Sequence, residues 1–139
     1  MPDEAARKRV ALEYCRRLNA GDVDGALALF AADVRYEDPV GGGALTGRAA
    51  VRAHLAEAVA NRVRETPGEP VAALDGEHVL LPCRAELDDA RLPAGSRLSV
   101  NFVAMLRVGA DGLIREMRMF WGRSDATVVA GAPEARVVR

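Results

Sequence analysis

Residues 29–41 read Leu29-Phe30-Ala31-Ala32-Asp33-Val34-Arg35-Tyr36-Glu37-Asp38-Pro39-Val40-Gly41, and the organisation of the rest of the chain depends on this stretch. A short run of alternating apolar residues ends at Glu37 and Asp38, and Pro39 with the glycines that follow breaks it. Because proline disfavours helix at the residue before it, Asp38 is predicted on extended backbone at a strand-to-turn boundary. A carboxylate there can point into a cavity, although Asp-Pro is also common in surface turns. Asp38 is therefore a candidate catalytic group.

An amphipathic helix is predicted before this stretch, from Ala5 to Asn19. Asp3 is a suitable N-cap and Gly21 a suitable stop signal. Apolar residues recur every four positions on one face, which is typical of a helix packed on a core. They are Ala6, Val10, Tyr14 and Leu18. Tyr14 therefore faces inward, either as a core aromatic residue or as a phenol donor in a pocket.

Two further helices are predicted, at Val23–Phe30 with Asp22 as its cap and at Arg48–Asn61 with Thr46 as its cap. The apolar face of the third helix carries Val51, Leu55, Ala58 and Val59. Arg52 and His54 lie near that face. A lone helical histidine is more often a hydrogen-bonded or surface residue than a catalyst.

The second half of the chain predicts strands at 71–74, 79–87, 98–108 and 113–121, with a short extended segment at 62–65. Pro82 implies an edge position or a bulge. Each long strand alternates and so has one apolar face. Those faces carry Val79, Leu81, Cys83, Ala85 and Leu87, then Leu98, Val100, Phe102, Ala104, Leu106 and Val108, then Leu113, Met117, Met119 and Trp121. Helices followed by a run of strands predict an α+β domain.

Length and composition restrict the possible functions. The 139 residues predict one domain over 1–130 with a flexible tail at 131–139. A net charge of −1 leaves no basic surface for nucleic acid. The longest apolar run, Ala26 to Ala32, is too short to span a bilayer, and the acidic N-terminus does not resemble a signal peptide. The two cysteines predict buried thiols, and hence a cytoplasmic protein.

The stretch from Leu29 to Gly41 resembles the catalytic segment of the steroid isomerase-like superfamily, also called SnoaL-like or nuclear transport factor 2-like. The resemblance implies a cone-shaped domain in which three N-terminal helices pack on one curved, mostly antiparallel sheet that encloses a pocket. It also implies that Asp38 is the general base and Tyr14 a hydrogen-bond donor. Ala104 stands where the steroid isomerases place a protonated aspartic acid, which argues against steroid isomerisation.

A closer resemblance is to the small epoxide hydrolases, or cyclases, of polyether-ionophore biosynthesis. The shared segments are Arg16-Arg17-Leu18-Asn19-Ala20-Gly21-Asp22, Glu37-Asp38-Pro39-Val40-Gly41, Arg52-Ala53-His54, Arg64-Glu65, Glu69-Pro70-Val71-Ala72 and 121–128. In that branch a second catalytic carboxylate corresponds to Glu65. Without the resemblance, Glu65 would be interpreted as a solvated charge beside Arg62 and Arg64.

The resemblance implies an enzyme that opens an epoxide on a polyketide without a cofactor or a metal. In this enzyme Asp38 is the base, Glu65 the acid and Tyr14 a hydrogen-bond donor. The predicted substrate-binding residues are Phe30, Arg52, His54, Leu81, Cys83, Ala85, Val100, Phe102, Ala104, Met117, Met119 and Trp121. Three alternatives remain: a pyran synthase acting by dehydration and conjugate addition, a double-bond isomerase, and a non-catalytic binding or partner subunit. A homodimer, or a pair with a paralogous cyclase, is expected through the opposite sheet face, which carries Asn101, Val103, Met105, Arg118 and Phe120.

Overall fold

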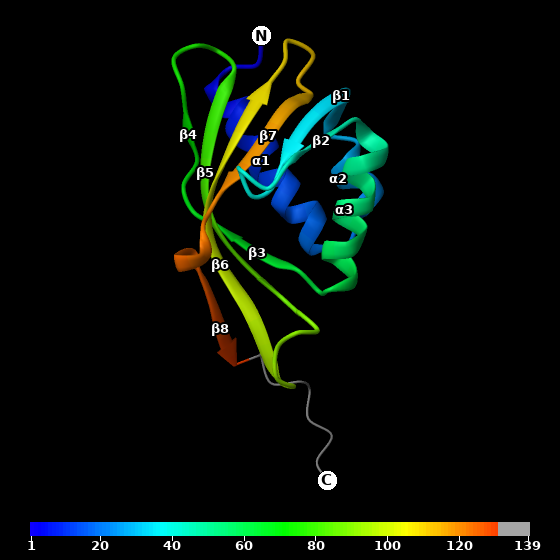
Figure 1. Cartoon of the computed structure of the whole chain (residues 1–139). Helices are drawn as coiled ribbons and strands as arrows, with labels where there is room; N and C mark the ends of the chain where they lie inside the picture. Colours follow the sequence, from blue (N-terminus) through cyan, green and yellow to red (C-terminus); the bar gives the residue numbers. More distant parts are fainter. Residues whose placement is uncertain (131–139) are drawn as a thin grey trace.

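The computed structural model describes residues 1–130 and shows three helices packed on one face of a curved sheet (Figure 1). The predicted tail at 131–139 lies outside the described residues. The helices are α1 (Glu4–Asn19), α2 (Val23–Leu27) and α3 (Arg48–Ala60). The strands are β1 (Phe30–Glu37), β2 (Ala44–Thr46), β3 (Arg64–Pro67), β4 (Val71–Ala72), β5 (His78–Leu87), β6 (Ser96–Val108), β7 (Ile114–Phe120) and β8 (Ala126–Ala130), with a 3₁₀ turn η1 (Arg123–Asp125) before β8.

The sheet has the strand order β2-β1-β7-β6-β5-β3, with β4 beside β5 and β8 beside β6. Only the β1–β7 pair is parallel among the described strands. The sheet does not close into a barrel, so the helices cover one face of a mixed, mostly antiparallel sheet. The predicted α+β class and cone-like architecture are confirmed.

The capping and stop residues in the sequence explain most helix boundaries, but they miss the end of α2 and the N-cap of α3. The Asp3 carboxylate accepts a hydrogen bond from the Ala6 backbone N–H at 2.7 Å, which fixes the start of α1. Helix α2 ends at Leu27 instead of Phe30, because Phe30 pairs with Ile114 and starts β1. Helix α3 begins after Gly47, whose φ of 87° favours glycine, while the expected cap Thr46 is the last residue of β2.

Strands β5 and β6 form a long antiparallel hairpin, paired from His78 opposite Arg107 to Leu87 opposite Leu98. On its other side β5 pairs first with β4 and then with β3, and Pro82 lies between the two pairings. The missing N–H of this proline therefore interrupts no ladder hydrogen bond there. The Pro82 carbonyl still accepts from the Gly68 N–H at 2.8 Å.

The return strand β7 differs from the prediction at its first residue. The register between β6 and β7 shifts at Arg107/Val108, so Ile114 pairs with Val108 and Glu116 pairs with Arg107. The extra residue turns the fully buried Ile114 inward in place of Leu113. From Met117 onward the predicted alternation holds.

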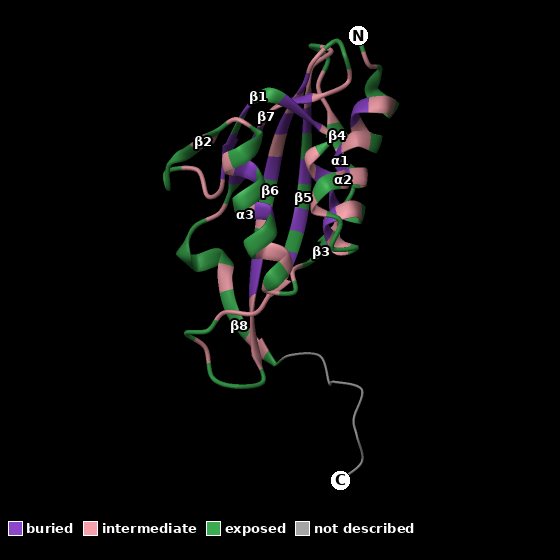
Figure 2. Ribbon diagram, turned by 90° about the vertical axis from the view of Figure 1, so that its right-hand side faces the viewer, coloured by how far each residue is buried: buried purple, intermediate pink, exposed green. Residues whose placement is uncertain are grey.

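The hydrophobic core fills the space between the helices and one end of the sheet (Figure 2). Its fully buried strand residues include Val79, Leu81, Ala104, Leu106 and Val108. These side chains meet Phe30, Val51 and Leu55 from the first strand and the third helix. No described helix is long and apolar enough to cross a membrane. The other end of the sheet is less filled, and the cavity described below lies there.

Candidate active site

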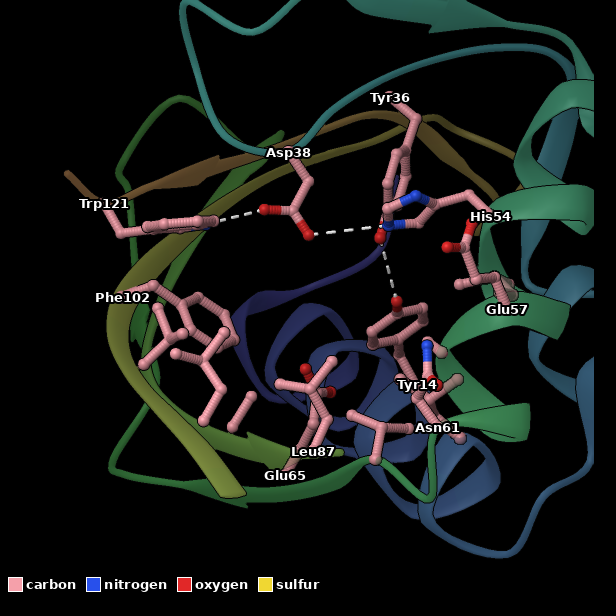
Figure 3. A pocket seen from close by; sticks show the side chains of 17 residues that line it. Tyr14, Tyr36, Asp38, His54, Glu57, Asn61, Glu65, Leu87, Phe102 and Trp121 are labelled. Atoms are coloured by element: carbon pink, nitrogen blue, oxygen red, sulfur yellow. Dashed lines mark hydrogen bonds and ion pairs between the residues drawn. The ribbon is translucent and has the colours of Figure 1, made fainter. Parts of the chain in front are cut away.

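A cavity of about 250 Å³ lies between the helices and the concave face of the sheet (Figure 3). The three predicted catalytic groups all line it: Tyr14 from α1, Asp38 after the end of β1, and Glu65 from β3. Its remaining lining residues are Leu18, Tyr36, His54, Leu55, Glu57, Ala58, Asn61, Val63, Ala85, Leu87, Leu98, Val100, Phe102 and Trp121. The fold thus gathers residues from distant parts of the chain into one apolar site with a few polar groups, the usual composition of a small-molecule pocket.

Asp38 is held between an indole and an imidazole. The Trp121 Nε1–H donates to Asp38 Oδ1 at 2.7 Å, and His54 Nε2 lies 3.6 Å from Oδ2 (Figure 3). The following turn is fixed to β7, because the Val40 N–H donates to the Met119 carbonyl at 2.9 Å. The Asp38 side chain is one-quarter exposed, 25%. Its Oδ2 therefore remains able to accept a proton from a bound molecule.

Glu65 occupies a very different environment. Its backbone is clamped by Asn19 at the end of α1, which accepts from the Glu65 N–H at 2.6 Å and donates to the Glu65 carbonyl at 2.8 Å. Burial raises the pKa of the Glu65 carboxyl to about 7, a hydrogen bond from Cys15 opposes that rise, and the nearby charge of Asp38 adds to it. The cavity therefore contains two carboxyl groups in different environments: Glu65 is buried with a raised pKa, and Asp38 is partly exposed and accepts a hydrogen bond from Trp121.

Tyr14 has a partner that the sequence did not single out. Its hydroxyl lies 3.2 Å from the hydroxyl of Tyr36, and both side chains are buried. Burial raises the pKa of both phenols well above the usual value, so both remain protonated donors. Side chains alternate between the two faces of a strand, so Val34, Tyr36 and Asp38 share one face. This pattern could have identified Tyr36 from the sequence. Tyr14 and Tyr36 thus form a pair of donors in the wall.

The structure brings the predicted wall residues to the cavity at one end of the sheet but not at the other. His54, Ala85, Val100, Phe102 and Trp121 line the cavity. The other predicted wall residues lie elsewhere in the described structure: Phe30, Arg52, Leu81, Cys83, Ala104, Met117 and Met119. Six of these are on the predicted inner face, but that part of the face is packed core. Phe30, for example, contacts the rings of Tyr14 and Tyr36 edge to face, with centroids 5.7 and 6.1 Å away.

Arg52 is the seventh correction. Its guanidinium forms an ion pair with Asp24 on the surface, away from the cavity. Helix α3 instead contributes the positions that follow His54 on the same face, namely Glu57, Ala58 and Asn61. Spacings of three, four and seven residues from His54 place these side chains along one helix stripe, and this signal could have found them.

Two clusters bring together groups that bind metals in other proteins. Asp75, Glu77 and His78 surround an exposed turn, where one Asp75 oxygen already accepts from two backbone N–H groups. In the second cluster, the ligand atoms of Cys15, Cys83 and Glu65 lie within 4.8 Å of one another and are buried. A hydrogen bond with Cys83 and burial raise the pKa of the Cys15 thiol.

Comparison with known proteins agrees with the fold. The chain is 47% identical over 130 residues to the epoxide hydrolase LasB of Streptomyces lasalocidi, an alignment that covers 94% of this chain and 46% of LasB. The chain thus spans about half the length of that relative. It is also 30% identical over 121 residues to the steroid Delta-isomerase of Nocardioides simplex, covering 87% of this chain and 94% of the isomerase.

Two solved structures are similar over nearly their whole length. SalBIII, described as an epoxide hydrolase/cyclase-like enzyme with a role in pyran ring formation in the polyether salinomycin, superposes with a TM-score of 0.88 at 36% identity, covering 93% of this chain and 100% of SalBIII. RV0760c from Mycobacterium tuberculosis, in complex with estradiol-17beta-hemisuccinate, superposes with a TM-score of 0.79 at 27% identity, covering 88% and 98%. Residues 11–117 match the SnoaL-like domain, and the chain belongs to the SnoaL-like family.

Proposed function

We propose that this protein is a cofactor-independent epoxide hydrolase/cyclase that closes cyclic ether rings on a polyketide chain. The likeness to LasB and SalBIII supports this reaction class. The observation that carries the proposal is the pair of unequal carboxyl groups in one cavity. Glu65 is buried with its pKa raised to about 7, whereas Asp38 is partly exposed and accepts a hydrogen bond from Trp121. Such a pair can divide acid and base roles at neutral pH.

Ring closure needs one proton removed and one proton supplied. Asp38 Oδ2 accepts the proton of the substrate hydroxyl as the oxygen lone pair forms a bond to an epoxide carbon. The epoxide C–O bond breaks, its electron pair stays on oxygen, and Glu65 protonates that oxygen. Asp38 is then protonated and Glu65 ionised, and a proton exchange through solvent restores both. One of the two hydrogen-bonded phenols, Tyr14 or Tyr36, donates to the departing oxygen, and the hydroxyl of the other donates to it in turn.

The size of the cavity limits what it encloses. Its volume of about 250 Å³ is below the ~300–1,000 Å³ of pockets that bury a whole drug-sized ligand. One hydroxy-epoxide segment fits, and the rest of a long polyketide must extend past the exposed Glu57 at the cavity rim. Ring size then depends on how the apolar wall folds that segment.

Pyran formation by dehydration and conjugate addition of a hydroxyl is the second candidate, and the 36% identity to SalBIII favours it. The same two carboxyl groups can remove and supply the protons of that reaction. Steroid-type isomerisation has less support. Ala104, where the steroid isomerases have an acid, is fully buried in the core and does not line the cavity.

The test uses a synthetic hydroxy-epoxide with an alkyl chain and follows its product by chromatography and mass spectrometry. Asp38→Asn and Glu65→Gln should each lower kcat by about 10²–10⁴-fold, the usual contribution of a general base or acid. Glu57→Gln is the matched control, because it removes a carboxylate from the rim of the same cavity and should retain turnover.

The product distinguishes the two candidates. Epoxide opening gives an isomer of the substrate with unchanged mass, whereas pyran formation from a dihydroxy enone precursor releases one water. If the wild-type protein turns over only the second substrate, pyran formation replaces epoxide opening. If Glu65→Gln is fully active on both, Glu65 has no acid role.

A further inference from the structure

The Glu65 carboxyl group lies against sulfur atoms in place of the usual donors. The Sγ atoms of Cys15 and Cys83 and a Glu65 carboxyl oxygen lie within 4.8 Å of one another. All three residues are buried, with at most 9% of their surface exposed. Glu65 Oε1 has no hydrogen-bond partner among residues 1–130. Figure 3 shows the Glu65 oxygens directed into the cavity.

Other carboxylates of this protein show what ordinary donors do. Glu37 accepts from the Gly41 N–H at 3.1 Å and from Arg118 at 3.2 Å, and these bonds lower its pKa despite partial desolvation. Glu13 is paired with two arginines, which lower its pKa to about 2. Glu65 has no such partner within hydrogen-bond distance in the described chain. A thiol is a weak donor and does little to favour the ionised form.

We propose that Cys15 is a positioning residue for Glu65: its thiol, which with that of Cys83 lies within 4.8 Å of a Glu65 carboxyl oxygen, keeps the carboxyl group turned towards the cavity as a proton donor. This inference rests on the proposed function in taking Glu65 as the acid. A hydroxyl at position 15 would bind the carboxylate more strongly and make it a weaker proton carrier at neutral pH. An apolar side chain would leave the carboxyl with no contact on that side.

Other titratable groups also face Glu65. Helix α1 contributes Tyr14 with Cys15, strand β1 contributes Tyr36, the turn after β1 contributes Asp38, and strand β5 contributes Cys83. Helix α3 adds His54 and Glu57 around the same cavity. Among these groups, Asp38 raises the pKa of Glu65 and Cys15 lowers it. A stronger donor at position 15 should therefore lower the pH at which Glu65 is half protonated, and removal of the donor should raise it.

The experiment titrates Glu65 by the infrared C=O absorption of its protonated carboxyl, with Glu65→Gln as the spectrum to subtract. Cys15→Ala should raise the midpoint by about 0.5–1 pH unit, the equivalent of one weak hydrogen bond. Cys15→Ser should lower it. Cys83→Ala is the matched control, because it removes a second buried thiol of equal size and should shift the midpoint by less than half as much.

Equal shifts of the Glu65 midpoint in Cys15→Ala and Cys83→Ala would overturn the proposal, because a general change in solvation would then explain both shifts. A shift of Cys15→Ser in the same direction as Cys15→Ala would also overturn it. If Cys15→Ala does not fold, Cys15→Val, which fills the site with an apolar side chain and also lacks the donor, takes its place. The alkaline limb of kcat against pH should follow the infrared midpoint in each variant. Because the infrared titration needs no turnover, failure of epoxide opening and failure of this inference are distinguishable.

Discussion

Glu65 imposes a stability cost on the fold when it is ionised. Its pKa is raised from 4.5 to about 7, chiefly by burial. Between these two values the folded protein keeps a proton that the unfolded chain has released. Stability therefore falls as pH rises through this window, by on the order of 3 kcal/mol in total. Glu65→Gln should melt several degrees higher than the wild type at pH 8, and the difference should shrink towards pH 5. Melting curves at both pH values check this, and a difference independent of pH would contradict it.

Trp121 permits a second prediction about a single residue. Its indole N–H is the donor to Asp38 Oδ1, and its ring also lines the cavity. Trp121→Phe keeps most of the ring and removes the donor. Without this donor the Asp38 carboxyl is no longer held in one orientation, and misplacement of a catalytic group can cost about 10²-fold, so kcat should fall by up to about that factor with little change in KM. Steady-state kinetics measure both. A rise in KM at constant kcat would instead show that Trp121 contributes only to the wall that binds the substrate.

Contacts between elements depend on side chains whose partners lie far away in sequence. Asn19 ends α1, and its amide pairs with both backbone groups of Glu65 on β3. Asn19→Ala leaves these two buried backbone groups without their partner. It should lower the free energy of unfolding by about 2–4 kcal/mol and reduce turnover, because Glu65 is no longer held in place. Chemical denaturation measures the first effect. Asn61→Ala, an amide at the cavity rim, is the control and should leave stability nearly unchanged.

At the level of elements, sequence alone could predict which face of each strand turns inward but not how far along that face the cavity extends. Alternation placed Val100, Phe102 and Ala104 on one face correctly. Whether a position on that face lines a cavity depends on what the helices put opposite it. Phe30 and the two tyrosines fill one end, so Ala104 is core and Val100 is wall. Such tertiary packing leaves no periodic signal in the sequence.

The site showed the same division between what was predictable and what was not. Asp38, Glu65 and Tyr14 could be selected because proline, spacing and family resemblance identify them individually. The contacts around them could not be selected, because Cys15 and Trp121 reach the carboxyl groups, and Asn19 the backbone of Glu65, only through the folding of distant segments. Tyr36 was the exception, since strand alternation alone identifies it.

For the whole molecule, the sheet face opposite the helices predicts self-association. Leu80, Val103 and Phe120 are each at least 40% exposed on it. Arg118 lies over the Phe120 ring, with its guanidinium carbon 5.2 Å from the centroid. An apolar patch of this kind is typical of an interface. We expect a homodimer at micromolar concentration by light scattering.

Phe120→Asp should shift this dimer to monomer while the melting temperature of the monomer stays measurable. Leu74→Asp is the matched control, because Leu74 is an apolar residue 98% exposed in the turn between β4 and β5 and is not one of the three patch residues. It should leave the mass unchanged. A wild-type protein that is monomeric at this concentration contradicts the predicted interface.

The long β5–β6 hairpin shapes the cavity wall, whereas the proposed reacting groups lie on other elements; many enzymes combine these two tasks in the same elements. Ala85, Leu87, Leu98, Val100 and Phe102 in the wall all belong to this hairpin. The proposed reacting groups lie on α1, β3 and the turn after β1. If the proposed function holds, a lineage that exchanges side chains in this one hairpin can acquire a new ring preference and inherit its proton chemistry unchanged, so that paralogues can diversify their products without a new reaction.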